Sequence, residues 1–235
     1  METQNQLFQR IAQAIERERR LTGDAAHELR SPLTAIKTHL QVARMTEGAA
    51  AEQALAHAEE GADRLHRTLD QLLLLARVEG SLSFDDGVQC SAEDAARVAM
   101  HDAGHGDVRM FELKLADGLS EAPLEVPSVL AIAALRNLLD NALRFTADGG
   151  EIRIRLGDRR LSVENQGPAI PPERLPRLFD RFYRADPARR EGQGEHAGLG
   201  LAICRSIVQA HGGEIRCESA DGWTRFVIDF ARPRR

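Results

Sequence analysis

A short polar segment near the start of the chain, His27-Glu28-Leu29-Arg30-Ser31-Pro32, holds side chains suited to chemistry. His27 and Ser31 are four residues apart, so they share one face of a helix. Pro32 cannot donate a hydrogen bond to the carbonyl of Glu28, which loosens the helix just past the histidine. Polar groups and a kink on an otherwise regular helix indicate a site, although a solvated histidine on a charged face explains the hexapeptide equally well.

A second segment, residues 137–145, offers oxygen ligands and a cation. Asn137, Asn141 and Arg144 form one polar helix stripe, and the opposite stripe is apolar and faces a core: Leu135, Leu138, Leu139 and Ala142. Amide oxygens four residues apart could hold a hard cation such as Mg²⁺ together with a bound phosphate. Arg144 could clamp that phosphate. A surface amphipathic helix is the alternative for this segment taken alone.

Two segments that contain glycine follow. Val163–Ile170 indicates a tight turn at the end of a strand, and Gly198-Leu199-Gly200-Leu201 opens a helix. Glycines at a helix start let backbone N–H groups approach a phosphate, and the helix dipole favours its charge. Small residues also begin helices for packing reasons, so the second segment by itself is weak evidence.

The elements that must position these residues differ between the two halves of the chain. Residues 1–80 predict two long helices, because apolar side chains recur every three to four residues on both sides of a turn at Thr46-Glu47-Gly48. Two such helices form an antiparallel hairpin, which alone leaves one apolar face in contact with water. Pairing two hairpins in a four-helix bundle would bury that face, so we predict a homodimer.

The second half predicts an α+β domain after a linker at residues 80–87. Alternating apolar residues predict strands near 111–115, 152–156, 161–163 and 226–230, and helical periodicity predicts helices near 92–103, 128–146 and 199–211. The helices should cover one face of a mixed sheet. The polar stretch 183–197 has no periodicity and predicts a long mobile loop.

Composition narrows the class of protein. The chain has 235 residues, of which 43% are apolar and 29% charged, as in ordinary globular proteins of one or two domains. A net charge of −5 argues against a nucleic-acid binder. No apolar stretch approaches the roughly 20 residues that cross a bilayer, and no signal segment is seen. Three widely spaced cysteines predict free thiols in a reducing compartment.

Together and in this order, the polar segments resemble the catalytic region of bacterial sensor histidine kinases. His27–Leu33 is similar to the H box of that family, Asn137–Thr146 to the N box, Val163–Ile170 to the G1 box, Leu178–Arg184 to the F box and Gly198–Leu201 to the G2 box. The resemblance covers nearly the whole chain. It implies a dimerisation and phosphotransfer hairpin followed by an ATP-binding α/β two-layer sandwich of the Bergerat type.

The resemblance also implies a domain order and an activity. A signalling linker helix would cover residues 1–20, a dimerisation and histidine phosphotransfer domain 21–80, and a catalytic ATP-binding domain 85–235. With ATP and Mg²⁺ as cofactors, the phosphoryl group would pass to His27 and then to an aspartate of a response regulator receiver domain. The chain would be the cytoplasmic portion of a longer protein, anchored in the bacterial inner membrane by an upstream sensor segment. A naturally soluble kinase is the alternative.

Roles for individual residues come from the same resemblance. His27 would be the phosphoacceptor, Glu28 would orient its ring or take its proton, and Ser31 would position a water for dephosphorylating the regulator, an activity that the sequence leaves open. Asn137 and Asn141 would contact ATP and hold Mg²⁺. The other residues implied in ATP binding are Arg144, Phe145, Asn165, Gly167, Ala169, Ile170, Phe179, Arg181, Phe182, Arg184, Gly198, Leu199, Gly200, Leu201 and Thr224.

The sequence departs from the family pattern at several positions. Asn165 stands where the family usually has an aspartate that accepts a hydrogen bond from the adenine amino group. Ala169 replaces the second glycine of the G1 box and is tolerable only if its φ is negative. His196 stands just before the G2 box, where a lid hydroxyl is lost. Trp223 replaces a common glycine, and we expect it to anchor the core or a sheet edge.

Two other functions are open to such a sequence. An ATPase of the gyrase or chaperone type would carry glutamate at the position of Asn137, as general base for water, and would have no use for His27. A non-catalytic dimeric scaffold, which binds ATP weakly or only engages a regulator, would explain the departures from the G1 and G2 boxes. It would not explain why His27, Glu28 and Gly198–Leu201 are intact.

Overall fold

The structure is a computed structural model, and it describes residues 23, 25–26, 28–79, 91–104, 111–115, 127–147, 149–157, 160–184 and 197–230. The chain divides into two compact units with a boundary between Leu72 and Leu73, and each unit is considered by itself. In the described part of the chain, no helix combines the length and the apolar character needed to span a membrane.

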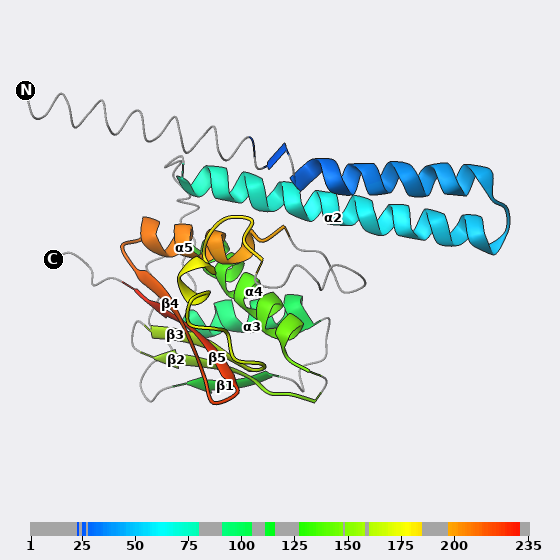
Figure 1. Cartoon of the computed structure of the whole chain (residues 1–235). Helices are drawn as coiled ribbons and strands as arrows, with labels where there is room; N and C mark the ends of the chain where they lie inside the picture. Colours follow the sequence, from blue (N-terminus) through cyan, green and yellow to red (C-terminus); the bar gives the residue numbers. More distant parts are fainter. Residues whose placement is uncertain are drawn as a thin grey trace, which may run out of the picture. The chain divides into compact units, whose positions relative to one another are not determined.

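The first unit is a helical hairpin (Figure 1). A helix over residues 28–45 is joined by a short turn to helix α2 (Ala49–Glu79), of which the residues up to Leu72 belong to this unit, and the two helices run antiparallel. Gly48, at φ 62°, supplies the left-handed residue of the turn, and its carbonyl accepts the first hydrogen bonds of α2. Gly61 lets the helices approach closely, because a Cβ there would lie 2.8 Å from Cγ1 of Ile36.

One face of this hairpin stays apolar and exposed. Four leucines of the first unit have exposed fractions of 44% or more: Leu33, Leu40, Leu55 and Leu69. Large apolar side chains in such number are uncommon on the surface of a helix pair that has no partner. The hairpin therefore has the exposed apolar face that its sequence pattern predicts.

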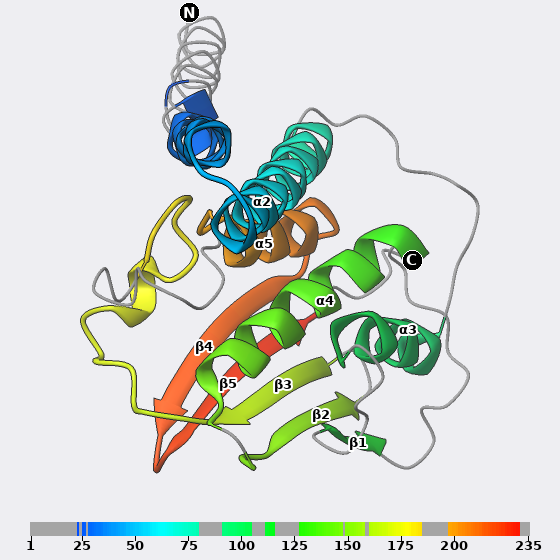
Figure 2. The same ribbon diagram turned by 90° about the vertical axis from the view of Figure 1, so that its right-hand side faces the viewer.

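The second unit contains a five-stranded sheet of the described strands, in the order β1-β2-β3-β5-β4 (Figure 2). The strands are β1 (Phe111–Leu115), β2 (Ile152–Gly157), β3 (Arg160–Gln166), β4 (Glu214–Ala220) and β5 (Trp223–Asp229). β1 and β2 are parallel, and the other neighbouring pairs are antiparallel. Between β4 and β5 the chain turns through Asp221 and Gly222, at φ 53° and 77°, as a tight two-residue hairpin requires.

Three helices cover one face of this sheet (Figure 2): α3 (Ala92–Gly104), α4 (Ser128–Phe145) and α5 (Gly200–Ala210). A short 3₁₀ turn, η2 (Leu175–Arg177), lies between β3 and α5 in the sequence. The predicted apolar stripe of α4 is at most 2% exposed: Leu135, Leu138, Leu139 and Ala142. It packs in a core with side chains from the strands and α5 that include Ile152, Ile154, Val163, Phe226, Ile228, Ile203 and Ile207.

The predicted fold class is confirmed, with a helical hairpin followed by a two-layer sandwich that has helices on one face of a mixed sheet. Four strands and three helices lie where periodicity predicted them. Strand β4 was not predicted. Ile215 is its one large apolar residue, and as an edge strand it has a neighbour on one side only. The linker at 80–87 lies outside the described residues, as does most of the predicted loop at 183–197.

Candidate functional site

The candidate phosphoacceptor His27 lies outside the described residues, but the helix that follows it is described. Glu28 is half-buried and Ser31 is exposed on this helix. The helix continues past Pro32, where the hydroxyl of Thr34 donates a hydrogen bond to the carbonyl of Arg30 at 2.8 Å. The helix therefore does not end at the proline, although the carbonyl of Glu28 loses its backbone donor there.

The polar stripe of α4 is half-buried at the edge of the core. Asn137 donates a hydrogen bond from Nδ2 to the carbonyl of Ala133 at 2.9 Å, which turns its Oδ1 away from that carbonyl. A Cβ built on Gly200 would lie 2.9 Å from this Oδ1, so the first residue of α5 sits directly against the amide oxygen. Asn141 lies one turn further along α4 and is also half-buried. The structure thus brings the predicted N box and G2 box together.

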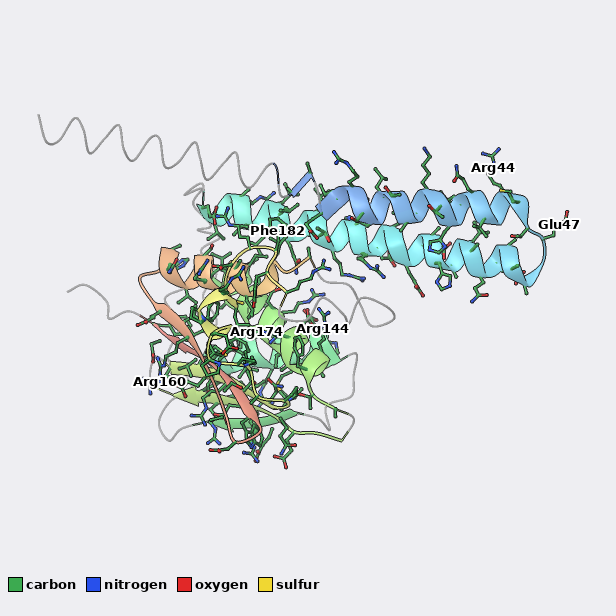
Figure 3. The ribbon with its side chains drawn as sticks, viewed as in Figure 1. Arg44, Glu47, Arg144, Arg160, Arg174 and Phe182 are labelled. Atoms are coloured by element: carbon green, nitrogen blue, oxygen red, sulfur yellow. The ribbon has the colours of Figure 1, made fainter. Side chains whose placement is uncertain are left out.

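Arg144 and Phe145 end α4 as a stacked pair. The guanidinium carbon of Arg144, which is labelled in Figure 3, lies 5.5 Å from the centre of the Phe145 ring, a cation–π contact at the end of the helix. A basic side chain in the last helical turn also interacts favourably with the helix dipole. The carbonyl of Phe145 is close to the turn after β3, because a Cβ on Gly167 would lie 2.8 Å from its oxygen.

The backbone before α5 is held in an uncommon conformation. Gly198 has φ +70°, and a Cβ on it would lie 2.9 Å from the carbonyl carbon of Phe182. Phe182 itself has φ 60°, and its N–H donates to the carbonyl of Gly198 at 3.0 Å. A bulky residue with positive φ is strained and persists where its surroundings fix it. The F box and the G2 box are therefore coupled through the backbone, which the sequence alone gave no reason to expect.

The turn after β3 carries the G1 box. Asn165 is 2% exposed, and its Nδ2 donates to the carbonyl of Gln166 at 3.3 Å. Among the described residues, the non-glycine residues with positive φ are Phe182 and Asp221 only. Ala169 therefore has the negative φ that an alanine needs at this position. The turn is tied to the β4–β5 hairpin, since the N–H of Gly167 donates to the carbonyl of Gly222 at 3.0 Å.

Asn165 belongs to a polar row across three strands at one end of the sheet. It pairs with Thr224 on β5, and Thr224 pairs with Ser219 on β4. Directly opposite residues place their side chains on the same face, which here continues the apolar core face of the sheet. The hydroxyls of Ser219 and Thr224 are 3.2 Å apart, and the N–H of Ile170 donates to Oγ of Ser219 at 2.9 Å.

The resemblance included Asn165, Ile170 and Thr224 among the residues implied in ATP binding and did not include Ser219. The signal that could have found it is the alternation of Ile215, Cys217 and Ser219, which predicts a strand facing the same core.

The predicted F box contributes to packing as well as charge. Phe179 is 7% exposed and meets Phe226 edge to face, with ring centres 6.2 Å apart. Arg181 forms an ion pair with Glu79, which lies in the same unit and also accepts a hydrogen bond from Ser206 at 3.2 Å. Arg184 is exposed. In this structure Arg181 therefore has a carboxylate partner of its own.

The outer face of the sheet, away from the helices, is a network of ion pairs. The buried carboxylate of Glu164 lies 2.8 Å from Nε of Arg155 and 3.0 Å from Nε of Arg225. Arg153 stacks on Trp223 at 4.1 Å from the ring centre, so Trp223 lies on the outer face of an interior strand, and not in the core or at a sheet edge as expected. The charges on this face are paired with one another, which indicates a structural role.

The titratable groups with shifted pKa values are also structural. The hydrogen bond from Arg160, at 2.6 Å, lowers the pKa of Asp229, with a further contribution from Arg216. Burial raises the pKa of the Cys217 thiol to about 12 and that of Cys204 still further. Both thiols are free, in agreement with the prediction, and neither is a reactive thiolate.

The donors near α4 suit a hard cation better than a soft one. In the described residues, no group of three or more histidine, cysteine, aspartate or glutamate side chains is placed to hold a metal ion. Asn137 presents an amide oxygen next to the start of α5, and Asn141 lies one turn away on the same helix. Oxygen donors of this kind fit Mg²⁺ that keeps waters and shares the phosphates of a nucleotide.

Comparison with known protein families assigns both units. Residues 17–81 match the family described as His Kinase A (phospho-acceptor) domain. Residues 128–234 match the family described as Histidine kinase-, DNA gyrase B-, and HSP90-like ATPase. The second match covers α4, β2 to β5, η2 and α5, and thus all the polar segments of the sandwich described above.

Relatives and solved structures agree with these matches. The chain is 38% identical over 239 residues to sensor protein QseC of Salmonella typhimurium, covering 98% of this chain and 51% of the relative. It is 34% identical over 231 residues to sensor histidine kinase CusS of Escherichia coli, covering 95% of this chain and 48% of the relative. The chain therefore spans about half the length of these relatives.

Solved histidine kinases share the fold. The structure of Acinetobacter baumannii histidine kinase AdeS has a TM-score of 0.70 at 22% identity, covering 88% of this chain and 98% of that one. Mycobacterial sensor histidine kinase MprB has a TM-score of 0.51 at 28% identity, covering 61% and 97%. With a phosphoacceptor domain and an ATPase domain in this order along one chain, the protein belongs to the sensor histidine kinase family of phosphotransferases.

Proposed function

We propose that this chain autophosphorylates on His27 with ATP and then passes the phosphoryl group to an aspartate of a response regulator receiver domain. The observation that carries the proposal is the approach of Gly200 to Oδ1 of Asn137. It places an amide oxygen beside the N-terminus of α5, where backbone N–H groups and the helix dipole favour a phosphate. The two groups that phosphoryl transfer from a nucleotide needs, an oxygen ligand and an anion site, are therefore adjacent.

Asn137 and Asn141 would hold Mg²⁺ in this arrangement. When bound, the ion would neutralise charge on the phosphates of ATP. Arg144, at the end of the same helix, would contribute a second positive charge. Arg181 and Arg184 are proposed to join them, Arg181 after release from its ion pair with Glu79.

The proposed reaction is in-line displacement at the γ-phosphorus. A nitrogen of the His27 imidazole forms a bond to phosphorus, the bond from phosphorus to the bridging β,γ-oxygen breaks, and ADP leaves. Glu28 orients the ring and accepts the proton of its other nitrogen as positive charge develops there. Little covalent chemistry is asked of the sandwich, whose task is to position the nucleotide and offset its charge.

The base of ATP is proposed to bind at the polar row. Asn165 would accept a hydrogen bond from the adenine amino group, with Thr224 beside it and the Gly167–Ile170 turn around it. A neutral amide makes a weaker bond than a carboxylate, by roughly 1 kcal/mol. The substitution should therefore lower ATP affinity several-fold without removing the site.

The assembly around the kinase reaction is also proposed. Two chains would pair through the exposed leucines of the hairpin to form a four-helix bundle. Ser31, exposed on the helix, would position a water for dephosphorylation of the regulator. The region would belong to a longer protein anchored in a bacterial inner membrane through an upstream sensor segment, consistent with the chain's span of about half its relatives.

The test is incubation of the chain with γ-labelled ATP and Mg²⁺, beside an H27Q variant. We expect label that is stable to base and labile to acid on the native chain and none on the variant. Label that persists in the variant would reject His27 as phosphoacceptor. Nucleotide binding without any label would favour the non-catalytic scaffold, and release of phosphate from ATP without labelled protein would favour an ATPase.

A further inference from the structure

Ser219 attaches the Gly167–Ile170 turn to β4, a strand that carries no other residue of the candidate site. The turn after β3 is attached to the β4–β5 hairpin at two points. One is a backbone bond, from the N–H of Gly167 to the carbonyl of Gly222 at 3.0 Å. The other reaches a side chain, from the N–H of Ile170 to Oγ of Ser219 at 2.9 Å across 49 residues of sequence. A substitution of the Ser219 side chain removes the second attachment and leaves the first, which joins two backbone groups, in place.

The same hydroxyl continues into the polar row. Oγ of Ser219 lies 3.2 Å from Oγ1 of Thr224 on β5, and Thr224 is the cross-strand partner of Asn165 on β3. One of the two hydroxyls donates its proton to the other, and the proton of the accepting hydroxyl points in another direction. Ser219 therefore links the backbone of Ile170 to Thr224, which is 5% exposed and lies opposite Asn165, which is 2% exposed.

We propose that Ser219 is a positioning residue of the nucleotide site, which fixes the Gly167–Ile170 turn and orients Thr224 beside Asn165. The inference rests on the proposed function only in taking this end of the sheet as the place where the base of the nucleotide binds. It adds a residue on β4, for which neither the motifs nor the matched families name a role. Ser219 acts through Ile170 and Thr224 and need not touch the nucleotide.

A purely structural role would have a different signature. Ser219 is only half-buried, and β4 is at the edge of the sheet with β5 as its one neighbour. Removing a hydroxyl there leaves no core cavity, and water can reach the edge of the sheet. The loss should therefore change how well the turn is ordered for the nucleotide much more than it changes the stability of the fold.

The experiment compares S219A with S219T and with S162A in the full chain. The threonine variant keeps the hydroxyl, and a threonine opposite Thr224 suits a cross-strand pair. Ser162 is a matched control on β3, because it is buried and its hydroxyl faces Glu164 at 3.4 Å on the other side of the sheet. Binding of ATP and ADP is measured by calorimetry, and autophosphorylation is measured at saturating ATP.

We expect S219A to raise the Kd for ATP and for ADP by a similar factor, about fivefold to tenfold for one lost hydrogen bond, while the saturating rate stays within twofold. S219T should return both Kd values to within twofold of the native chain, and S162A should leave them unchanged. A native-like Kd in S219A overturns the proposal, as does an equal weakening in S162A. A fall in the saturating rate with unchanged Kd overturns it as well.

Amide exchange supplies a readout that does not depend on the nucleotide or on folding of the alanine variant. In the native chain and in S219T the Ile170 amide should be protected from exchange, and in S219A its exchange should accelerate with little change at Gly167. An unprotected Ile170 amide in the native chain overturns the proposal directly. If the native chain binds ATP but His27 gains no phosphate, the proposed function fails, and the Kd comparison still decides the role of Ser219.

Discussion

Gly200 offers the sharpest test of how the helices position the site. The variant G200A adds a Cβ that would lie 2.9 Å from Oδ1 of Asn137, closer than such a carbon and oxygen can rest. The backbone at Gly200 has no positive φ, so alanine can adopt its conformation. The added methyl group must therefore act by displacing the side chain of Asn137, and not by straining the helix.

The expected stability change is small, because two effects oppose each other. Alanine in place of glycine stabilises an α-helix by about 0.5–1 kcal/mol. Turning Asn137 away from its rotamer costs about 0.5–1.5 kcal/mol, and weakening its bond to the carbonyl of Ala133 costs a similar amount. The sum is a net destabilisation of about 0–2.5 kcal/mol, which corresponds to a fall in Tm of less than about 10 °C.

The expected loss of activity is much larger than the loss of stability. Misplacing a group at a reacting centre by an ångström can lower a rate about a hundredfold. We therefore expect kcat/KM for autophosphorylation to fall at least tenfold in G200A. The control is G157A, in which the new Cβ would lie at an ordinary 3.4 Å from the carbonyl oxygen of Arg160. Its activity should match that of the native chain.

A double-mutant cycle decides whether the methyl group acts through Asn137. If it does, adding G200A to an N137A background should lower the rate little further, because the displaced side chain is already absent. Additive losses in the double variant would mean that the methyl group obstructs the nucleotide itself. Native-like kcat/KM in G200A would refute the assignment of Asn137 to the phosphate end of the site.

Three further outcomes are expected. N165D should raise the affinity for ATP about fivefold through a charge-assisted bond, and calorimetry that shows weaker binding would contradict this. The same change should lower the Tm of the nucleotide-free chain, because it places a carboxylate where the native side chain is only 2% exposed. G198A should lower the Tm more than G222A, since both glycines have positive φ but only Gly198 has backbone atoms within 3.0 Å of the new Cβ. The folded-state pKa of Asp229 is lowered by its bond from Arg160, so its contribution is present above the usual aspartate pKa and lost as pH falls through the folded value. In acid titrations of unfolding, D229N should be less stable than the native chain by under about 1 kcal/mol near pH 7 and should lose less stability below pH 4; parallel curves would contradict this.

Local pattern sufficed for the elements with strong periodicity. The apolar stripe of α4 is buried as its spacing predicts, and the strands rich in branched residues lie where they alternate. Strand β4 was not predicted, because its side chains are mostly polar and its pairing with β5 is a tertiary feature. Ser219 was not predicted for the same reason, since its role depends on its position opposite Thr224 in the sheet. The positive φ of Phe182 is likewise imposed by the approach of Gly198, which no local propensity encodes.

The glycines of the nucleotide motifs meet two separate physical needs, and this distinction explains which departures the fold accepts. Gly198 is needed both for its φ of +70° and for space beside Phe182, while Gly167 and Gly200 are needed for space alone, since a Cβ at either would collide with Phe145 or Asn137. Ala169 has neither a positive φ nor an obligation to lie against another element, and it is exposed. Alanine there leaves the turn intact, because Gly167 and Ile170 fasten it to the hairpin on either side. Glycine is therefore required at a motif position only where the backbone has a positive φ or where another element lies too close for a Cβ. The consensus sequence of the motif does not by itself show which positions those are.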